Sequence, residues 1–173
     1  LEVVARFVEA GLVYKKLKPV PWSVSNQTAL ADAELEYKDV EDPSVFVEFA
    51  ATDADKVRCV FGGGTSGPPV SLLIWTTTPW TLPANLAIAV HPDVEYQLVE
   101  YERAGRPRAA VVAAPLVERV FAVPGVRVVS TSQAVKGQAL VDARLTYKHA
   151  FVERVGRVLP ALYVTTTDGR MTI

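Results

Sequence analysis

Short runs in which apolar and polar residues alternate dominate the second half of this 173-residue chain. The alternation is clear in residues 86–91 and 94–98, and residues 70–77, 108–114 and 126–130 are further runs rich in β-forming residues. A period of two residues is typical of half-buried strands. Many short strands with few helices predict a mainly β fold with a few short helices (α+β), whose sheet is closed or strongly curved like a β-barrel.

The first half of the chain is less regular. Residues 1–10 carry apolar side chains at helical spacing, and Gly11 is a typical helix stop. A short turn capped by its first residue is predicted over 28–31. Residues 35–40 are predicted to form a strand, with a helix as the alternative for so short a run, and 44–49 are β-rich by residue type.

Glycines and prolines mark residues 50–69 as a surface loop. The segment contains Gly62-Gly63-Gly64 and Pro68-Pro69. A glycine triplet cradles phosphate only where a strand precedes it and a helix follows, and the two prolines argue against that helix. A flexible loop is therefore favoured over a phosphate site. Residues 115–121 are predicted to form a short helix that a proline begins.

Composition limits the class of protein. Half of the residues are hydrophobic, which suits one globular domain, and no apolar run is long enough to span a bilayer. With 18 Lys+Arg against 19 Asp+Glu, any contact with nucleic acid is expected to be local. The single cysteine, Cys59, fits an intracellular, reducing compartment. We expect the cytoplasm, with an organelle as the alternative.

One segment stands out for its chemistry, Thr76-Thr77-Thr78-Pro79-Trp80-Thr81-Leu82-Pro83-Ala84-Asn85, which directly follows an apolar run. Prolines restrict the backbone, so threonine hydroxyls can be held in place with little entropy loss. Such a segment can orient a small substrate and a water, but it contains no strong nucleophile or metal ligand. From residue types alone, a β-rich edge ending in a proline-stiffened turn explains it equally well.

The segment resembles the threonine-rich signature Thr-Thr-Thr-Pro-Trp-Thr-Leu-Pro-x-Asn of the editing domain of isoleucyl-, valyl- and leucyl-tRNA synthetases. Residues 18–23 look like the segment by which the chain passes from the catalytic domain into the editing domain in this family. Residues 28–37 are similar to the Thr-Ala-Leu-Ala-x-Ala-Glu-x-Glu-Tyr run of its isoleucyl members. Residues 166–169 look like the start of its Asp-Gly-Thr-Gly-x-Val-His motif. A later Gly…Leu…Tyr-x-His-x-Phe pattern is matched by Gly137, Leu140, Tyr147, His149 and Phe151.

The resemblance implies residue roles. The three threonines of 76–78 would line an editing pocket, Thr81 and Asn85 would complete its wall or hold the terminal adenosine and the water, and Trp80 would shape it. Catalysis is thus assigned to Thr76, Thr77, Thr78 and Asn85, and substrate binding to Thr76, Thr77, Trp80 and Thr81. His91, as a strand-end residue, and His149, as part of a structural pattern, are given no catalytic role.

The resemblance also implies a function: hydrolysis of Val-tRNA(Ile), of valyl-adenylate, or of both, as part of an isoleucine–tRNA ligase. One missing methylene is worth only about 1–3 kcal/mol to a binding pocket, a limit for which isoleucyl-tRNA synthetase is itself the standard example. The implied partners are the 3′ end of aminoacylated tRNA(Ile), valine or valyl-adenylate, and the catalytic domain of the same chain, without a membrane and as a monomer. No cofactor or metal is expected in this domain, since ATP and magnesium belong to the catalytic domain.

The implied organisation places a linker from the catalytic domain at residues 1–22 and the editing domain at 23–173. After Gly169 the sequence departs from the family, because Arg170-Met171-Thr172-Ile173 stand where Thr-Gly-x-Val-His and then an acidic residue are expected. The motif is therefore truncated or replaced. In the family, the acidic residue binds the amino group of the substrate. Without it, this chain is expected to bind the aminoacyl substrate better than it hydrolyses it.

Three alternatives remain. The editing domain of a valyl-tRNA synthetase, which clears threonine, shares most of the same motifs. A non-catalytic β-barrel could stack single-stranded RNA on Trp75 and Trp80. The absence of Lys and Arg from residues 71–92 counts against this module. A purely structural insertion is the third.

Overall fold

The computed structural model describes residues 1–41 and 43–165, and the chain divides into two compact units, 1–41 and 42–173. The first unit begins with α1 (Glu2–Glu9), which confirms the helix predicted over 1–10. Gly11 ends it with a φ of +71°, and the Leu12 N–H donates to the Phe7 carbonyl at 2.9 Å. This left-handed glycine satisfies carbonyls that the last turn leaves free.

The rest of the first unit differs from the prediction. Thr28 does not cap a turn but lies in β2 (Thr28–Ala29), which pairs with β1 (Trp22–Ser23). A 3₁₀ helix, η1, spans Asp32–Glu34. The strand predicted over 35–40 is wrong, because no neighbouring strand pairs with these residues in the described part of the chain, and Tyr37 is 88% exposed. Residues 23–41 belong to this first compact unit, whereas the predicted linker ended at residue 22.

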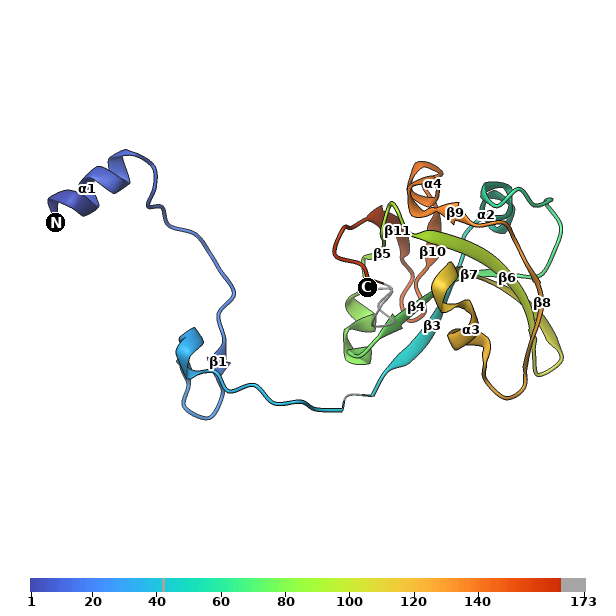
Figure 1. The fold of residues 1–173 in the computed structure, drawn as a ribbon, viewed down its shortest axis with the longest axis horizontal. Coiled ribbons are helices and arrows are strands. Elements are labelled where there is room, and N and C mark those ends of the chain that lie inside the picture. Colours follow the sequence, from blue (N-terminus) through green and yellow to red (C-terminus); the bar gives the residue numbers. More distant parts are fainter. Residues whose placement is uncertain (42, 166–173) are drawn as a thin grey trace. The chain divides into compact units, whose positions relative to one another are not determined.

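A six-stranded sheet forms most of the second unit (Figure 1). Its order is β3-β4-β7-β6-β8, with β9 also pairing with β6, and only β4 and β7 run parallel. Four of the five long strands coincide with predicted runs, and the fifth, β3, coincides with the β-rich residues 44–49. The strands are β3 (Val45–Ala50), β4 (Val70–Thr76), β6 (Glu95–Arg103), β7 (Arg106–Ala113), β8 (Val126–Thr131) and β9 (Val135–Lys136).

A three-stranded sheet completes the second unit, in the order β10-β11-β5. β10 (Thr146–Lys148) is antiparallel to β11 (Val155–Pro160), which runs parallel to β5 (Ala87–Val90). An isolated β-bridge between Ala51 and Tyr147 links the two sheets. Of the two forms predicted, a closed or a strongly curved sheet, the closed one is wrong, because the edge strands β3 and β8 do not pair with each other and no sheet closes within the described residues.

Short helices cover parts of the sheets. The predicted loop over 50–69 contains α2 (Ala54–Val60), whose N-terminus is capped by Asp53 accepting from the Lys56 N–H at 2.9 Å. The glycine triplet follows this helix rather than a strand and is irregular. The helix predicted over 115–121 is confirmed as the 3₁₀ turn η3 (Ala114–Leu116) and α3 (Val117–Phe121). The remaining helix is α4 (Gly137–Asp142).

One core joins both sheets, and it includes the fully buried Phe49, Ile74, Val99 and Tyr147. Among the described residues, no helix is long and apolar enough to cross a membrane.

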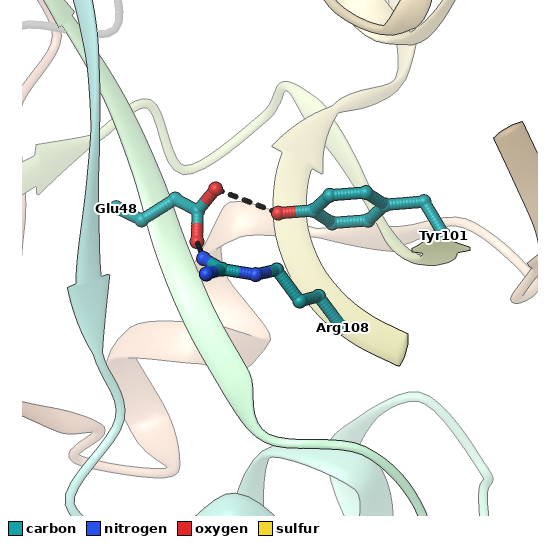
Figure 2. A network of polar contacts seen from close by, with 3 residues as sticks. All are labelled: Glu48, Tyr101 and Arg108. Carbon is teal, nitrogen blue, oxygen red and sulfur yellow. Dashed lines mark hydrogen bonds and ion pairs between the residues drawn. The ribbon is translucent and has the colours of Figure 1, made fainter. Parts of the chain in front are cut away.

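The six-stranded sheet also carries a polar network (Figure 2). The Tyr101 hydroxyl donates to Glu48 at 2.7 Å, and Arg108 Nη1 donates to the other carboxylate oxygen at 2.8 Å. The pKa of Tyr101 is raised above its ordinary value, mainly by burial and in addition by the hydrogen bond to Glu48. The hydrogen bond to Glu48 likewise raises the pKa of Arg108. The three groups satisfy one another and link β3, β6 and β7.

Candidate functional site

The threonine segment forms a hydroxyl cluster where β4 ends. Thr76, the last residue of β4, is buried, and its Oγ1 accepts from the backbone N–H of Thr78 at 3.0 Å. The two threonine hydroxyls lie 3.1 Å apart. Thr78 precedes the 3₁₀ helix η2 (Pro79–Ala84), and the Thr81 hydroxyl donates to the Thr78 carbonyl at 2.7 Å. These bonds fix the positions of three hydroxyls relative to one another.

A cavity of about 640 Å³ opens beside this cluster. Of the six residues predicted for the site, Thr76, Thr78, Thr81 and Asn85 line it. Thr77 and Trp80 are not among the lining residues, and Trp80 is 70% exposed. The remaining lining residues are Ala84, Leu86, Ala87, Ala89, Leu159, Pro160, Ala161 and Tyr163.

The parallel pair β5 and β11 supplies the apolar part of the cavity. Ala87 and Ala89 from β5 pair with Arg157 and Leu159 of β11, and the segment after β11 adds Tyr163. β5 is shorter than the predicted run, since Leu86 lies before it and is 71% exposed. The cavity therefore joins one hydroxyl-bearing wall to walls of small and branched apolar side chains.

Asn85 is held by the framework on several sides. It is only 4% exposed, its Nδ2 donates to the Ala87 carbonyl at 2.8 Å, and its Oδ1 accepts from the Tyr147 hydroxyl. Its backbone carbonyl accepts from Arg154 Nη1 at 2.9 Å. Burial raises the pKa of Tyr147, although the charge of Arg154 opposes the shift, so the phenol stays protonated and donates. The Oδ1 atom is thus committed to Tyr147, and Asn85 positions the end of η2.

His149 holds the same segment from a position just after β10. Its Nδ1 accepts from the backbone N–H groups of Phe151 and Val152 at 3.0 and 3.2 Å. Its Nε2 lies 2.9 Å from the Leu82 carbonyl in η2 and therefore carries the proton and donates. The structural role predicted for His149 agrees with these contacts. We call Tyr147, His149 and Arg154 the rear clamp, because each bonds to η2 or to Asn85 and none of the three lines the cavity.

The chemistry available to the cavity is that of hydroxyls and apolar walls. None of the described lining residues is charged, and residues 1–41 and 43–165 contain no group of three His, Cys, Asp or Glu able to hold a metal. Hydroxyls can orient a water and donate to an oxyanion. The resemblance at 166–169 and the divergent residues 170–173 lie outside the described residues.

Sequence reasoning missed the β11 side of the cavity and the rear clamp. Leu159 and Tyr163 reach the cavity only because β11 pairs in parallel with β5. Parallel partners can lie far apart in the sequence and leave no local signal. The Tyr-x-His pattern at residues 147–149 was visible, but its hydrogen bonds to η2 and Asn85 were not.

Comparison with known proteins places the chain in a family. Residues 1–167 match the tRNA synthetases class I (I, L, M and V) family. The chain is 43% identical over 169 residues to an isoleucine–tRNA ligase of Geobacillus thermodenitrificans, covering 98% of the chain and 17% of that protein. It is also 43% identical to an isoleucine–tRNA ligase of Sodalis glossinidius, covering 88% of the chain and 16% of that protein.

The fold has a counterpart among solved structures. The crystal structure of GlLeuRS-CP1 superposes with a TM-score of 0.51 at 14% identity, covering 98% of this chain and 51% of the other. At that identity the likeness concerns the fold alone. This chain spans about one sixth of the length of the isoleucine–tRNA ligases that it matches, and it belongs to the class I tRNA synthetase family of the I, L, M and V enzymes.

Proposed function

We propose that this chain is the editing domain of an isoleucyl-tRNA synthetase and that its cavity holds valine, esterified to tRNA(Ile) or joined to AMP, for hydrolysis. The observation that carries the proposal is the convergence of the Thr76, Thr78 and Thr81 hydroxyls with Asn85 on one uncharged cavity. The identity to isoleucine–tRNA ligases supports the isoleucyl branch.

The proposed reaction needs a positioned water rather than a protein nucleophile. The water oxygen attacks the carbonyl carbon of the ester, and the resulting oxyanion accepts hydrogen bonds from threonine hydroxyls. The tetrahedral intermediate collapses as the C–O bond to the ribose breaks, and the ribose oxygen leaves with a proton. Valine and free tRNA are the products.

Size selection would come from the apolar walls. Leu86, Leu159 and the alanines of β5 surround the space next to the hydroxyls. An added methylene in a well-packed site costs on the order of 1–3 kcal/mol, which is about 5- to 150-fold in affinity. A valyl group is therefore expected to fit where an isoleucyl group does not.

Binding of non-hydrolysable valyl- and isoleucyl-adenosine analogues, measured by calorimetry, tests the proposal. The valyl analogue should bind at least fivefold more tightly. Thr76→Val keeps the shape of Thr76 but removes the acceptor for the Thr78 N–H, so it should weaken valyl binding about tenfold. Ser130→Ala, on the edge strand β8 of the six-stranded sheet, is the control and should leave the affinity for the valyl analogue unchanged.

Each rival predicts a different result. Equal affinities for the two analogues would contradict a size filter, and binding of a threonyl analogue alone would assign the domain to the valyl branch. A stacking RNA module would bind single-stranded RNA without regard to the aminoacyl group. A purely structural insertion would bind none of these ligands.

Catalysis is tested separately from binding. Deacylation of Val-tRNA(Ile) should be much faster for a chain extended after Gly169 with Thr-Gly-x-Val-His and the acidic segment of the family than for this chain. A charged partner for the substrate ammonium is worth roughly 1.5–3 kcal/mol and also orients the ester. Equal rates would show that the threonine segment suffices.

A further inference from the structure

Arg58 is a buried cation whose guanidinium is mostly unpaired. It lies in the last turn of α2, is only 3% exposed, and donates through Nη2 to the Pro68 carbonyl. Its Nε and Nη1 have no hydrogen-bond partner within residues 1–41 and 43–165, and no ion pair of those residues includes it. Buried charges are normally paired, because transfer of an unpaired charge out of water is very unfavourable. Arg58 therefore calls for an acceptor that the described part of the chain does not supply.

A cavity of about 290 Å³ lies beside Arg58 and shares no residue with the threonine cavity. Residues 62–64 and Ser66, which follow α2, form one part of its lining. Residues 130–132, at the end of β8 and directly after it, add three hydroxyls. The cavity thus places one buried cation among hydroxyl groups. It is several times larger than the roughly 30 Å³ that one water takes up in the liquid, so a small ion with part of its hydration shell fits.

Glu100 on β6 is the acidic residue among the described residues that line this cavity. Its Oε2 accepts from the Ser130 hydroxyl at 3.0 Å, so the carboxylate is bonded to β8 and not to Arg58. The negative charge of Glu100 opposes an anion at Arg58. Removal of that charge should therefore strengthen the binding of an anion.

The loop after α2 covers the guanidinium on one side and is open on another. A Cβ added to Gly67 would lie 2.8 Å from Arg58 Nη2, whereas a Cβ added to Gly64 would have no heavy atom within 4 Å. The Arg58 carbonyl, at the end of α2, accepts from the Phe61 and Gly63 N–H groups at 3.0 and 2.9 Å. The site therefore depends on the guanidinium and not on a glycine loop before a helix, which the sequence argument excluded.

We propose that the cavity beside Arg58 binds a small tetrahedral oxyanion of the phosphate type, and that the bound anion stabilises the second unit. Such an anion offers acceptor oxygens in several directions, which suits donors as dispersed as Nε, Nη1 and the hydroxyls of Ser66 and Thr131. Arginine pairs well with phosphate because its guanidinium is weakly hydrated and its bonds to an anion are charge-assisted. The inference is independent of the proposed editing function, since the two cavities share no residue.

Thermal unfolding in matched salts tests the site. The unfolding midpoint of this chain should be higher in sodium phosphate than in sodium chloride of equal pH and ionic strength, by about 5–10 °C at a phosphate concentration of about a hundred times Kd. Arg58→Met removes the charge and keeps an apolar stem. Replacement of a buried charge by an apolar side chain is often neutral or stabilising, so the midpoint of this variant in chloride should not fall. The effect of phosphate on it should disappear.

Two carboxylate variants on β6 test the location of the site. Glu100→Gln keeps an acceptor for Ser130 and removes the charge beside Arg58, so phosphate affinity, measured by calorimetry, should rise about fivefold. Glu102→Gln, on the same strand but outside the cavity lining, is the control of equal charge and should leave the phosphate affinity unchanged. Methyl phosphate separates two sources of the group. Weaker binding of methyl phosphate assigns the site to the free ion, and equal binding assigns it to a phosphate ester.

The outcomes that would overturn the site are distinct. Equal unfolding midpoints of the unaltered chain in the two salts would do so, and so would a phosphate effect that survives Arg58→Met. If Glu100→Gln lowered the midpoint in chloride and abolished the phosphate effect, Glu100 would be the partner of Arg58 in solution, and the anion site would be wrong. The affinity for the valyl analogue should be the same in phosphate and in chloride, because the threonine cavity is separate.

Discussion

The two sheets of the second unit use their polar side chains differently. In the six-stranded sheet, Glu48, Glu100 and Glu102 each bond to a side chain of the same sheet, Glu48 to both Tyr101 and Arg108 (Figure 2). In the three-stranded sheet, Arg157 has no acidic partner in the part of the chain that the structure describes, and the neighbouring cavity is lined by hydroxyls. Matched groups stabilise a fold, whereas unmatched groups at a cavity can be satisfied by a ligand.

This difference assigns stability to the six-stranded sheet, and recognition to the three-stranded sheet together with Thr76, the last residue of β4. The rear clamp is the exception, since Tyr147 on β10 and His149 just after it bond inward to Asn85 and to η2. Substitutions in the larger sheet at positions other than Thr76 should therefore change the free energy of unfolding alone. Substitutions around the clamp should change both stability and ligand affinity.

The largest effect is expected from Gly156→Ala. Gly156 on β11 pairs with Tyr147, and a Cβ there would overlap the tyrosine ring. Displacing a fully buried ring should cost about 3 kcal/mol of unfolding free energy, measured by chemical denaturation, and should abolish binding of the valyl analogue. Gly64→Ala has no atom within 4 Å of the added Cβ and is the matched control. A loss below about 0.5 kcal/mol at Gly156, within the usual range for surface substitutions, would contradict the packing described.

Tyr147→Phe should have the next largest effect. It leaves Oδ1 of the buried Asn85 without its donor, which should cost about 2 kcal/mol of unfolding free energy. Because Asn85 lines the cavity, affinity for the valyl analogue should fall as well. Full stability together with unchanged affinity would show that the rear clamp does not position the site.

Tyr101→Phe is the counterpart in the six-stranded sheet, with a smaller expected cost of about 1 kcal/mol. Glu48 keeps its bond to Arg108 at 2.8 Å, so no carboxylate is left without a partner. Affinity for the valyl analogue should not change. A loss of affinity equal to that of Tyr147→Phe would remove the distinction between the two sheets.

The smallest effect concerns alkaline pH. The pKa of Tyr101 is raised above its ordinary value of 10.0, mainly by burial, and the pKa values of Tyr96 and Tyr147 are raised for the same first reason. The stability that these groups contribute is present below pH 10 and is lost as pH rises through the folded pKa. When the pH is raised from 8 to 10, the free energy of unfolding should decrease in both proteins. The decrease should be about 0.4 kcal/mol smaller in Tyr101→Phe than in the unaltered chain. An equal or larger loss in the variant would contradict the shift.

The sequence predicted the strands of the second unit better than their closure. Period-two alternation located β5 and β6, since alternation reports a half-buried face directly, and runs of β-forming residues located β4, β7 and β8. Whether the first and last strands of a sheet meet depends on distant contacts that alternation does not encode, so the predicted closure of the sheet was wrong. The helix α2 was missed because glycines and prolines further along the same segment suggested a loop throughout.

The candidate site was predictable in part for a similar reason. Thr76, Thr78 and Thr81 lie close together in the sequence, so the high density of hydroxyl groups in this segment was visible without a structure. Tyr147 and Arg154 reach Asn85 from 62 and 69 residues away, and nothing local marks them as its partners. The exposure of Trp80 could not be read from residue type, because a tryptophan serves equally as a pocket wall or as a surface residue.

The parallel pairing of β5 with β11 has a consequence for the order of events during folding. The threonine segment and β5 leave the ribosome well before β11, whose residues complete the cavity. Contacts between segments distant in sequence form late, because a long loop must first be closed. A growing chain therefore presents its hydroxyls before it has a cavity to hold a ligand, and the capacity to bind should emerge only once β11 has docked.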